Sequence, residues 1–481
     1  MVDSSVDSRA DTSPSTSTIR GLLVAPIRWL TMLSAETSWS FVVAVVIVNG
    51  VSQGFGGALS EVATDYYMKD VLKVQPSEAQ IYSGIAYVPW IVKPLWGLLT
   101  DVVPMVGYRR RPYLLAAGLL GVLSMLVLST SKIHLAIAVV LLTGGNASVA
   151  VSDVTVDACV AENSISRPAL AADMQALCSL SESLGALVGF IISGITLHLI
   201  GPMGVFGLLM VPAGLVALLG LTFDEPCLTD FSYKQVGRQF VEAGKAMFLR
   251  LSCPAVWRPC VYMYVSFALS LDIADGMFYW YTDAKNGPLF SQEIVGLLFS
   301  AGSVGSIAGG LLYQLALKDH PFRRVCLWTQ IVSSLSGMLD LLLVLRLNLK
   351  YGIPDSSFAV ADRAVSQMIK SLKWMPFLVL GSKMCPTGIE GTFFALLMSI
   401  DNFGVLSSRW LGGLLLHILG VTKTQFDNLW LAILIRNILR ASPLCLLFLI
   451  PDGDPKSNLF LADVVRQPEN VELIALVDST D

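Results

Sequence analysis

Long apolar stretches alternate with short polar ones along most of the chain. A helix needs roughly 20 mostly apolar residues to cross the hydrocarbon core of a membrane. Backbone groups in lipid must be hydrogen-bonded within the chain, which favours helices over other elements. The pattern therefore predicts twelve membrane-spanning helices. Their expected ranges are 39–64, 80–101, 112–130, 133–156, 169–197, 203–222, 257–280, 291–315, 323–346, 358–382, 391–418 and 427–450.

A polar stretch at 223–256 is the longest one between the expected spans, and it divides them into six and six. We expect an N-terminal six-helix bundle at 39–222, a cytoplasmic central loop at 223–256 and a C-terminal six-helix bundle at 257–450. Polar cytoplasmic segments are expected at 1–38 and 451–481. Two six-helix bundles around a central solute site are typical of the major facilitator architecture. The predicted fold class is an all-α membrane protein of that type.

Composition agrees with a membrane protein and excludes several other classes. Hydrophobic residues make up 54% of the chain, charged residues make up only 14%, and the mean hydropathy is +0.66. The net charge of −4 argues against a nucleic-acid partner, which would favour a basic surface. The eight cysteines and four histidines show no metal-ligand spacing, and no phosphate-binding loop of the ATPase type occurs. We therefore expect no cofactor, no metal and no enzymatic activity.

Lysine and arginine concentrate in alternate loops. One set of loops includes Arg109–Arg111, the central stretch and Arg323–Arg324, and the other set is poorer in basic residues. By the positive-inside rule, both chain ends and the central loop should be cytoplasmic. Gly185 with Gly189 shows the small-residue spacing that lets membrane helices approach closely, and Gly305 with Gly309 repeats it.

Charged side chains within the expected spans are the main functional candidates, because each costs roughly 2.5–3.5 kcal/mol at the bilayer centre on insertion scales. Such a residue faces the bundle interior or water. The alternative to a functional role is an interior salt bridge, or a side chain near a helix end that extends to the membrane interface. The candidates are Glu61, Asp65, Lys93, Asp153, Asp157, Glu162, Glu182, Asp272, Asp275, Lys370, Lys373, Asp401, Arg409 and Arg436.

Asp153 and Asp157 lie four residues apart and so share one helix face. Two neighbouring carboxylates repel each other, which would suit the binding and release of a proton. The alternative is a structural cluster in which these residues and Glu162 pair with Arg109–Arg111 at the cytoplasmic mouth.

Three stretches carry a resemblance to a known family. Residues 89–97 read PWIVKPLWG, and Asp101 and the run GYRRRPYL at 107–114 follow them. Residues 153–162 read DVTVDACVAE, and residues 385–395 read CPTGIEGTFFA. Together these motifs resemble the folate–biopterin transporter family, a branch of the major facilitator superfamily. They fall in both halves, so the resemblance covers most of residues 39–450.

The resemblance implies folates and pterins as solutes. A folate tail is anionic and needs basic partners, for which we expect Lys93, Lys370 and Arg409, with Lys373 close by. The edge of a pterin ring presents adjacent N–H donors that one carboxylate, Asp272 or Asp275, would accept. Its flat ring would stack on an aromatic side chain, Tyr279 or Trp280.

The remaining roles concern coupling and gating. Asp153 or Asp157 would bind a coupling proton. The loop that carries Asp101 and Arg109, Arg110 and Arg111, together with Glu162, would latch the cytoplasmic side. The chain departs from the family pattern at Asn163, Ser164, Gly391 and Asp401, which leaves the identity of the solute open.

The sequence thus predicts a multi-pass secondary active transporter of folates or pterins in the lipid bilayer, with proton symport as one mode of coupling. A carrier of another small organic anion on the same fold stays open, as does a membrane receptor without transport activity. Plasma and internal membranes both remain possible locations, and the architecture is compatible with a monomer.

Overall fold

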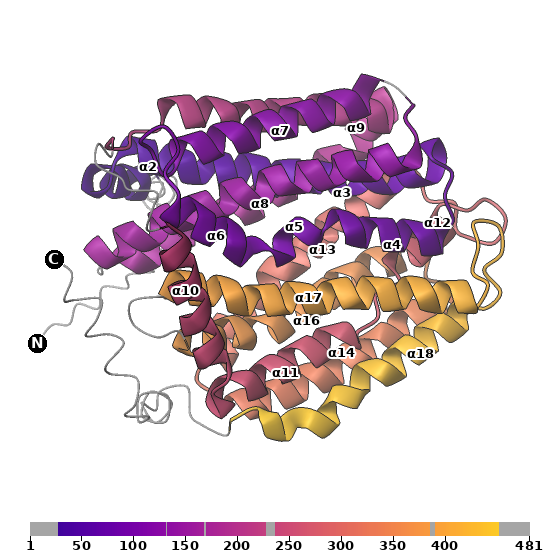
Figure 1. Cartoon of the computed structure of the whole chain (residues 1–481). Coiled ribbons are helices and arrows are strands. Elements are labelled where there is room, and N and C mark those ends of the chain that lie inside the picture. Colours follow the sequence, from indigo (N-terminus) through magenta and orange to yellow (C-terminus); the bar gives the residue numbers. More distant parts are fainter. Residues whose placement is uncertain (1–26, 131, 168–169, 228–235, 385–389, 452–481) are drawn as a thin grey trace, which may run out of the picture.

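The chain folds as a bundle of long helices that run side by side (Figure 1). The computed structural model describes residues 27–130, 132–167, 170–227, 236–384 and 390–451. Within these ranges every regular element is a helix, and the only β pairing is an isolated bridge between Met105 and Tyr108. The expected all-helical fold is confirmed.

The first half begins with one continuous helical run. Its four segments are α2 (Trp39–Val45), the π-helix η1 (Val46–Gly56), α3 (Gly57–Tyr66) and the π-helix η2 (Tyr67–Val71). The run starts where the Ser38 hydroxyl accepts the Phe41 N–H at 3.1 Å, which is a typical N-terminal cap. It extends to Val71, beyond the expected end at residue 64.

The second membrane-crossing segment is broken into three short helices, α4 (Pro76–Ala86), α5 (Val88–Ile91) and α6 (Lys93–Val102). Pro89 and Pro94 lie in the first turns of α5 and α6. A proline has no N–H to donate to the preceding turn, so each one is tolerated where a new helix starts. Lys93 therefore lies at the first position of α6.

The first half is completed by α7 (Arg111–Thr130), α8 (Leu135–Ser166) and α9 (Ala171–Thr222). Gly201 interrupts α9 with φ 68° and ψ 173°, and Pro202 follows it. Leu177 and Leu219, on either side of this break, belong to one buried cluster, and Leu197 and Phe206 belong to another. The chain therefore reverses at Gly201, so α9 holds the fifth and sixth expected spans.

The second half follows a helix that the sequence pattern did not reveal. The stretch expected as a central loop contains α10 (Val236–Leu251), which crosses the ends of neighbouring helices (Figure 1). The later elements are α11 (Pro254–Ala268), α12 (Ala274–Tyr281), α13 (Gln292–Leu312), η5 (Tyr313–Leu317), α14 (Phe322–Val344), α15 (Leu347–Lys350), α16 (Asp355–Met384), α17 (Glu390–Ile418), α18 (Leu429–Ala441) and η6 (Ser442–Leu449).

Both glycine pairs lie at close helix contacts, as expected. A Cβ atom on Gly185 would lie 2.0 Å from the carbonyl oxygen of Gly50, and one on Gly305 would lie 2.0 Å from that of Ala364. No side chain fits at such distances. Glycine therefore lets α9 pack on η1, and α13 pack on α16.

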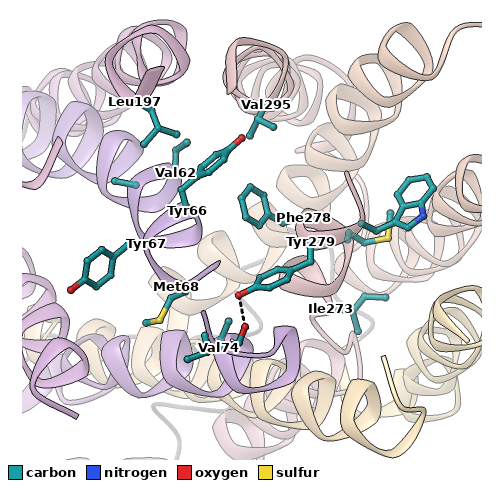
Figure 2. Close-up of a cluster of buried hydrophobic side chains, with 14 of the residues drawn as sticks. Val62, Tyr66, Tyr67, Met68, Val74, Leu197, Ile273, Phe278, Tyr279 and Val295 are labelled. Carbon is teal, nitrogen blue, oxygen red and sulfur yellow. Dashed lines mark hydrogen bonds between the residues drawn. The ribbon is translucent and has the colours of Figure 1, made fainter. Parts of the chain in front are cut away.

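The halves meet most extensively along two helix pairs, α9 with α13 and α4 with α17, and α17 also packs against α5 and α6. A buried apolar cluster joins them where α3 and η2 meet α12 (Figure 2). There the rings of Tyr66 and Phe278 pack edge to face with centroids 4.9 Å apart, and the Tyr279 hydroxyl donates to the Val74 carbonyl at 3.1 Å. The two halves are therefore held together at this end of the bundle.

Among the residues that the structure describes, seven helical segments are long and apolar enough to cross a membrane, by length and composition. One of them, Asp173–Thr222, contains both helical segments of α9, before and after the reversal at Gly201. The expected spans outside these seven segments are either broken or more polar. Each expected range is mainly helical in the described residues, so the structure is consistent with twelve spans. α8 continues to Ser166, past its expected end at residue 156, and so carries Asp157 and Glu162 on the same helix as Asp153.

Candidate functional site

Lys93 forms the centre of a first charged group. Its ammonium lies 2.6 Å from Asp153 Oδ2 and 3.1 Å from Asp157 Oδ2, so it joins α6 to two successive turns of α8. The side chain of Asp153 is 4% exposed and that of Asp157 is 50% exposed. The ammonium also lies 5.7 Å from the ring centroid of Trp90. One cation thus serves two carboxylates, which leaves this group with one negative charge when all three side chains are ionised.

Arg409 forms the centre of a second charged group, on the facing side of the interface between the halves. Its Nε atom lies 3.7 Å from Asp272 Oδ2, and its guanidinium lies 5.2 Å from the ring centroid of Tyr87. It also donates to the Ser83 carbonyl at 3.4 Å. Arg409 therefore contacts both halves, because Tyr87 and Ser83 belong to the second span and Asp272 to the seventh.

A break between α11 and α12 places two carboxylates close together. Asp272 accepts the N–H of Ala274 at 2.9 Å, and Asp275 lies in the first turn of α12. Carboxylates are stabilised at the N-terminal end of a helix by the unpaired backbone N–H groups there. Asp275 is buried, and its backbone N–H donates to Gln80 Oε1 across the interface at 3.0 Å.

Glu61 and Asp65 on α3 join this second group from the opposite half. Asp65 interacts electrostatically with Asp275, Glu61 and Arg409. Lys370 on α16 interacts electrostatically with Asp272, Glu61 and Arg409. Glu61 and Lys370 are both exposed, and the charged groups that act on them include residues of the opposite half. They therefore face the space between the halves rather than the lipid.

The two expected stacking residues lie inside the apolar core. Tyr279 is 1% exposed and Trp280 is 2% exposed. A different aromatic pair lies between the two charged groups: Tyr87 and Trp90 stack with their centroids 6.2 Å apart and their planes 22° apart. Asn402 on α17 holds this pair, because it accepts the Tyr87 hydroxyl at 3.0 Å and donates to the Trp90 carbonyl at 3.1 Å.

Sequence reasoning did not select Tyr87 or Asn402. The signal for Tyr87 is its spacing, three residues before Trp90 and six before Lys93. Asn402 carries no such signal, because its role depends on the contact between α17 and the broken second span.

Lys373 differs from the other expected basic residues because it is enclosed within the second half. It is 4% exposed, and it donates to the Ser266 carbonyl at 3.0 Å and to the Ser270 hydroxyl at 3.1 Å. In this conformation it does not face the space between the halves.

The loop between α6 and α7 is tied together by Arg110. Its guanidinium donates to Asp101 at 2.8 Å and to Glu162 at 2.6 Å. Glu162 thus pairs with the basic run as one interpretation expected, whereas Asp153 and Asp157 pair with Lys93 instead. Glu225, which sequence reasoning missed, accepts the backbone N–H groups of Arg109, Arg110 and Arg111 at 2.7–3.0 Å. Its signal is weak, since it is one of several acidic residues after the sixth span.

A cavity of about 280 Å³ lies beside this loop. It is lined by Ser38, Phe41, Arg109, Arg110, Cys159, Glu162, Asn163, Phe223, Asp224, Glu225 and Pro226. All of these residues belong to the first half or to the segments directly before and after it.

Comparison with known proteins identifies the family. The sequence profile described as the BT1 family matches residues 53–461. The chain belongs to the BT1 family. It is 56% identical to "Probable folate-biopterin transporter 2" of Arabidopsis thaliana, over 97% of this chain and 96% of that protein. It is 32% identical to "Folate-biopterin transporter" of Synechocystis sp., over 89% of this chain and 85% of that protein. The expected family resemblance is confirmed.

Solved structures share the fold of this BT1 family member. The chain matches a D-xylose–proton symporter with a TM-score of 0.60 at 13% identity, over 89% of this chain and 99% of that one. It matches a POT family transporter in complex with 5-aminolevulinic acid with a TM-score of 0.62 at 10% identity, over 85% and 94%. The major facilitator fold and the integral membrane character are thereby confirmed. Residues 385–389 of the third family motif lie outside the described residues.

Proposed function

We propose that this chain is a secondary active transporter of folates or pterins. The names of its BT1 relatives support this substrate class, and the shared fold supports transport rather than catalysis. The observation that carries the proposal is the position of the stacked Tyr87–Trp90 pair between two basic side chains, Lys93 and Arg409. The pair lies at the contact between the halves, where a major facilitator carrier binds its solute.

The chemistry of this region suits a flat ring with an anionic tail. A pterin ring would stack on Tyr87 or Trp90, which are better placed than the enclosed Tyr279 and Trp280. Asp272 or Asp275 would accept the N–H donors of its edge.

The anionic tail needs basic side chains. The tail carboxylates of a folate would bind Lys370 and Arg409, which face the space between the halves, with charge-assisted hydrogen bonds. Lys93 would join them once it leaves Asp157. Lys373 would contribute through its charge, since its own hydrogen bonds are made within the second half.

The way in which Lys93 is held supports proton coupling. A proton bound by Asp153 or Asp157 would remove one of the two charges that retain the ammonium, which would free Lys93 for an anionic solute. Release of the proton would restore the three-residue group and expel the anion. This exchange of partners supports symport of a proton with the solute.

Alternating access would use the two ends of the bundle differently. We assign the moving bodies to residues 39–222 and 257–450, connected by 223–256. The contacts of Tyr279 and Val74 close the end near α12. At the other end, Asp101, Glu162 and the basic run bind one another within the first half, so this latch would stiffen that half rather than bridge to the second. The distribution of basic loops supports cytoplasmic chain ends, and a monomer would suffice.

Uptake of labelled folic acid, biopterin and unrelated organic anions tests the proposal, in cells without their own folate uptake. Saturable uptake of folic acid or biopterin, with competition between the two, is expected. A Lys370→Ala variant should lose affinity for folic acid more than for biopterin, because only folic acid carries the anionic tail. Saturable uptake of another anion, with no folate or pterin uptake by protein shown at the cell surface, would replace the solute and keep the carrier. Absence of counterflow for every solute in proteoliposomes would favour a receptor.

A further inference from the structure

Asp401 is a buried carboxyl group with an incomplete set of hydrogen bonds. It lies on α17, and its side chain is 6% exposed. Its Oδ2 atom accepts the indole N–H of Trp374 at 2.9 Å, whereas Oδ1 has no hydrogen-bond partner among the described residues. An ionised carboxylate with a single neutral donor is costly inside a protein, by several kcal/mol. A protonated carboxyl group avoids most of that cost.

A basic partner lies nearby but is turned away. Lys373 on α16 is buried as well, and its ammonium donates to Ser266 and Ser270 and lies 5.1 Å from the ring centroid of Phe267. Lys373 acts electrostatically on Asp401, yet the two form no ion pair within 4.0 Å in the described part of the chain. The two groups thus have complementary charges and lie on adjacent helices without direct contact.

We propose that Asp401 is a proton-binding group of the transport cycle, protonated in this conformation and ionised when Lys373 pairs with it. The step releases the proton to water, and the carboxylate then accepts the ammonium of Lys373, which leaves Ser266 and Ser270. The inference rests on the proposed transport function, to which it adds a coupling site in the second half, separate from Asp153 and Asp157.

The surroundings of Asp401 suit a proton better than a metal ion. Within the described ranges, Lys373 and Lys370 on α16 are the charged groups that act on it, and Trp374 is the one hydrogen-bond donor to it. Tyr87, across the interface, interacts with it electrostatically. Sodium or calcium would need several oxygen ligands. No group of three potential metal-binding His, Cys, Asp or Glu side chains occurs in the described ranges.

Asp401 is connected to the proposed solute site through its neighbour in sequence. Asn402 bonds to the Tyr87 hydroxyl and to the Trp90 carbonyl. A movement of Asp401 toward Lys373 would displace the α17 backbone at Asn402 and so disturb the aromatic pair. Binding of a proton at Asp401 would thereby favour the arrangement in which the pair is held for the solute.

Infrared difference spectra between the purified wild type and its Asp401 variants test the protonation of Asp401 directly, and the measurement needs no solute. The wild type is expected to show the C=O band of a protonated carboxyl group that Asp401→Asn lacks and Asp401→Glu retains at a shifted frequency. A spectrum in which Asp401→Asn leaves all such bands unchanged would overturn the proposal. Asp401→Glu also serves if the asparagine variant does not fold, because the shift of the band identifies the residue.

Transport in proteoliposomes tests the coupling. Labelled folic acid and biopterin are used as probes, with counterflow as the measure of exchange and accumulation under a gradient of one pH unit as the measure of coupling. Each coupled proton contributes about a tenfold accumulation under that gradient. Asp401→Asn should keep counterflow within about threefold and lose about tenfold in accumulation.

The outcomes separate this inference from the proposed function. Unchanged accumulation in Asp401→Asn, with normal counterflow, would show that Asp401 carries no coupled proton. Accumulation that follows a sodium gradient and is lost in Asp401→Asn would overturn the assignment of a proton. Absence of counterflow in the wild type for both probes would overturn the choice of solute, while the infrared band would still decide the protonation of Asp401.

Discussion

The strength of the Lys93 ion group can be measured by removing its cation. Lys93→Met keeps the length and the apolar stem of the side chain but leaves Asp153 and Asp157 without their shared partner. Asp153, 4% exposed, has little access to water, whereas Asp157, 50% exposed, is readily hydrated. Removing one partner of a buried ion pair costs about 3–5 kcal/mol, because the other charge remains uncompensated. Nearly all of this loss should come from Asp153.

Paired variants make the reasoning testable by thermal unfolding of the purified protein, followed with a dye that reacts with newly exposed cysteines. Lys93→Met should unfold at a clearly lower temperature than the wild type. Adding Asp153→Asn should recover most of the loss, because it removes the uncompensated charge. Adding Asp157→Asn is the matched control and should recover little. Equal recovery by the two asparagine substitutions, or no loss in Lys93→Met itself, would refute the argument from burial.

Three further predictions concern packing, the cytoplasmic loop and the solute site. Gly185→Leu should abolish the monodisperse peak in fluorescence-detected size exclusion, because the added Cβ atom would lie 2.0 Å from a backbone oxygen of η1. Gly57→Ala is the control and should leave the peak unchanged, because no atom lies within 4 Å of a Cβ added there. Glu225→Ala should speed trypsin cleavage at Arg109–Arg111, because three backbone N–H groups lose their acceptor; cleavage as slow as in the wild type would contradict this role. Tyr87→Ala should weaken biopterin binding by about 0.5–1.5 kcal/mol in isothermal titration, whereas Tyr87→Phe should retain the stacking contribution; equal losses would argue against stacking.

The sequence alone predicted the helical membrane fold because hydropathy is a local property, whereas the division into halves at 223–256 stays a prediction. It missed α10, because that helix is short and amphipathic and lies in a region too polar to be read as a span. It expected one continuous second span at 80–101, where the structure has α4, α5 and α6, so it did not show that Lys93 lies at the start of α6. Those breaks follow from Pro89 and Pro94, which are visible in the sequence.

The candidate site was predicted less completely than the fold. Lys93, Asp272, Asp275 and Arg409 were selected because a charge within a span is costly unless it has a partner, and in the structure each of them interacts with other charged groups. Their role in solute binding stays a prediction. The expected stacking residues Tyr279 and Trp280 are enclosed in this structure, and nothing in the sequence distinguishes a ring in the core from one at the interface. Asp275 and Tyr279 are close in sequence on the same short helix, yet Asp275 interacts with the facing charges and Tyr279 lies in the core.

The first helical run has a property that a uniform α-helix would lack. α3, which carries Glu61 and Asp65, lies between the two π-helical segments η1 and η2. A π-helix bonds each N–H to the carbonyl five residues back instead of four. Suppose that η1 lost its one extra residue relative to an α-helix and η2 gained one. α3 would then turn about its axis by about 100°, the angle per residue of an α-helix. Both carboxylates would then swing together to another side of the helix, without any change in the length of the run or in its two anchored ends.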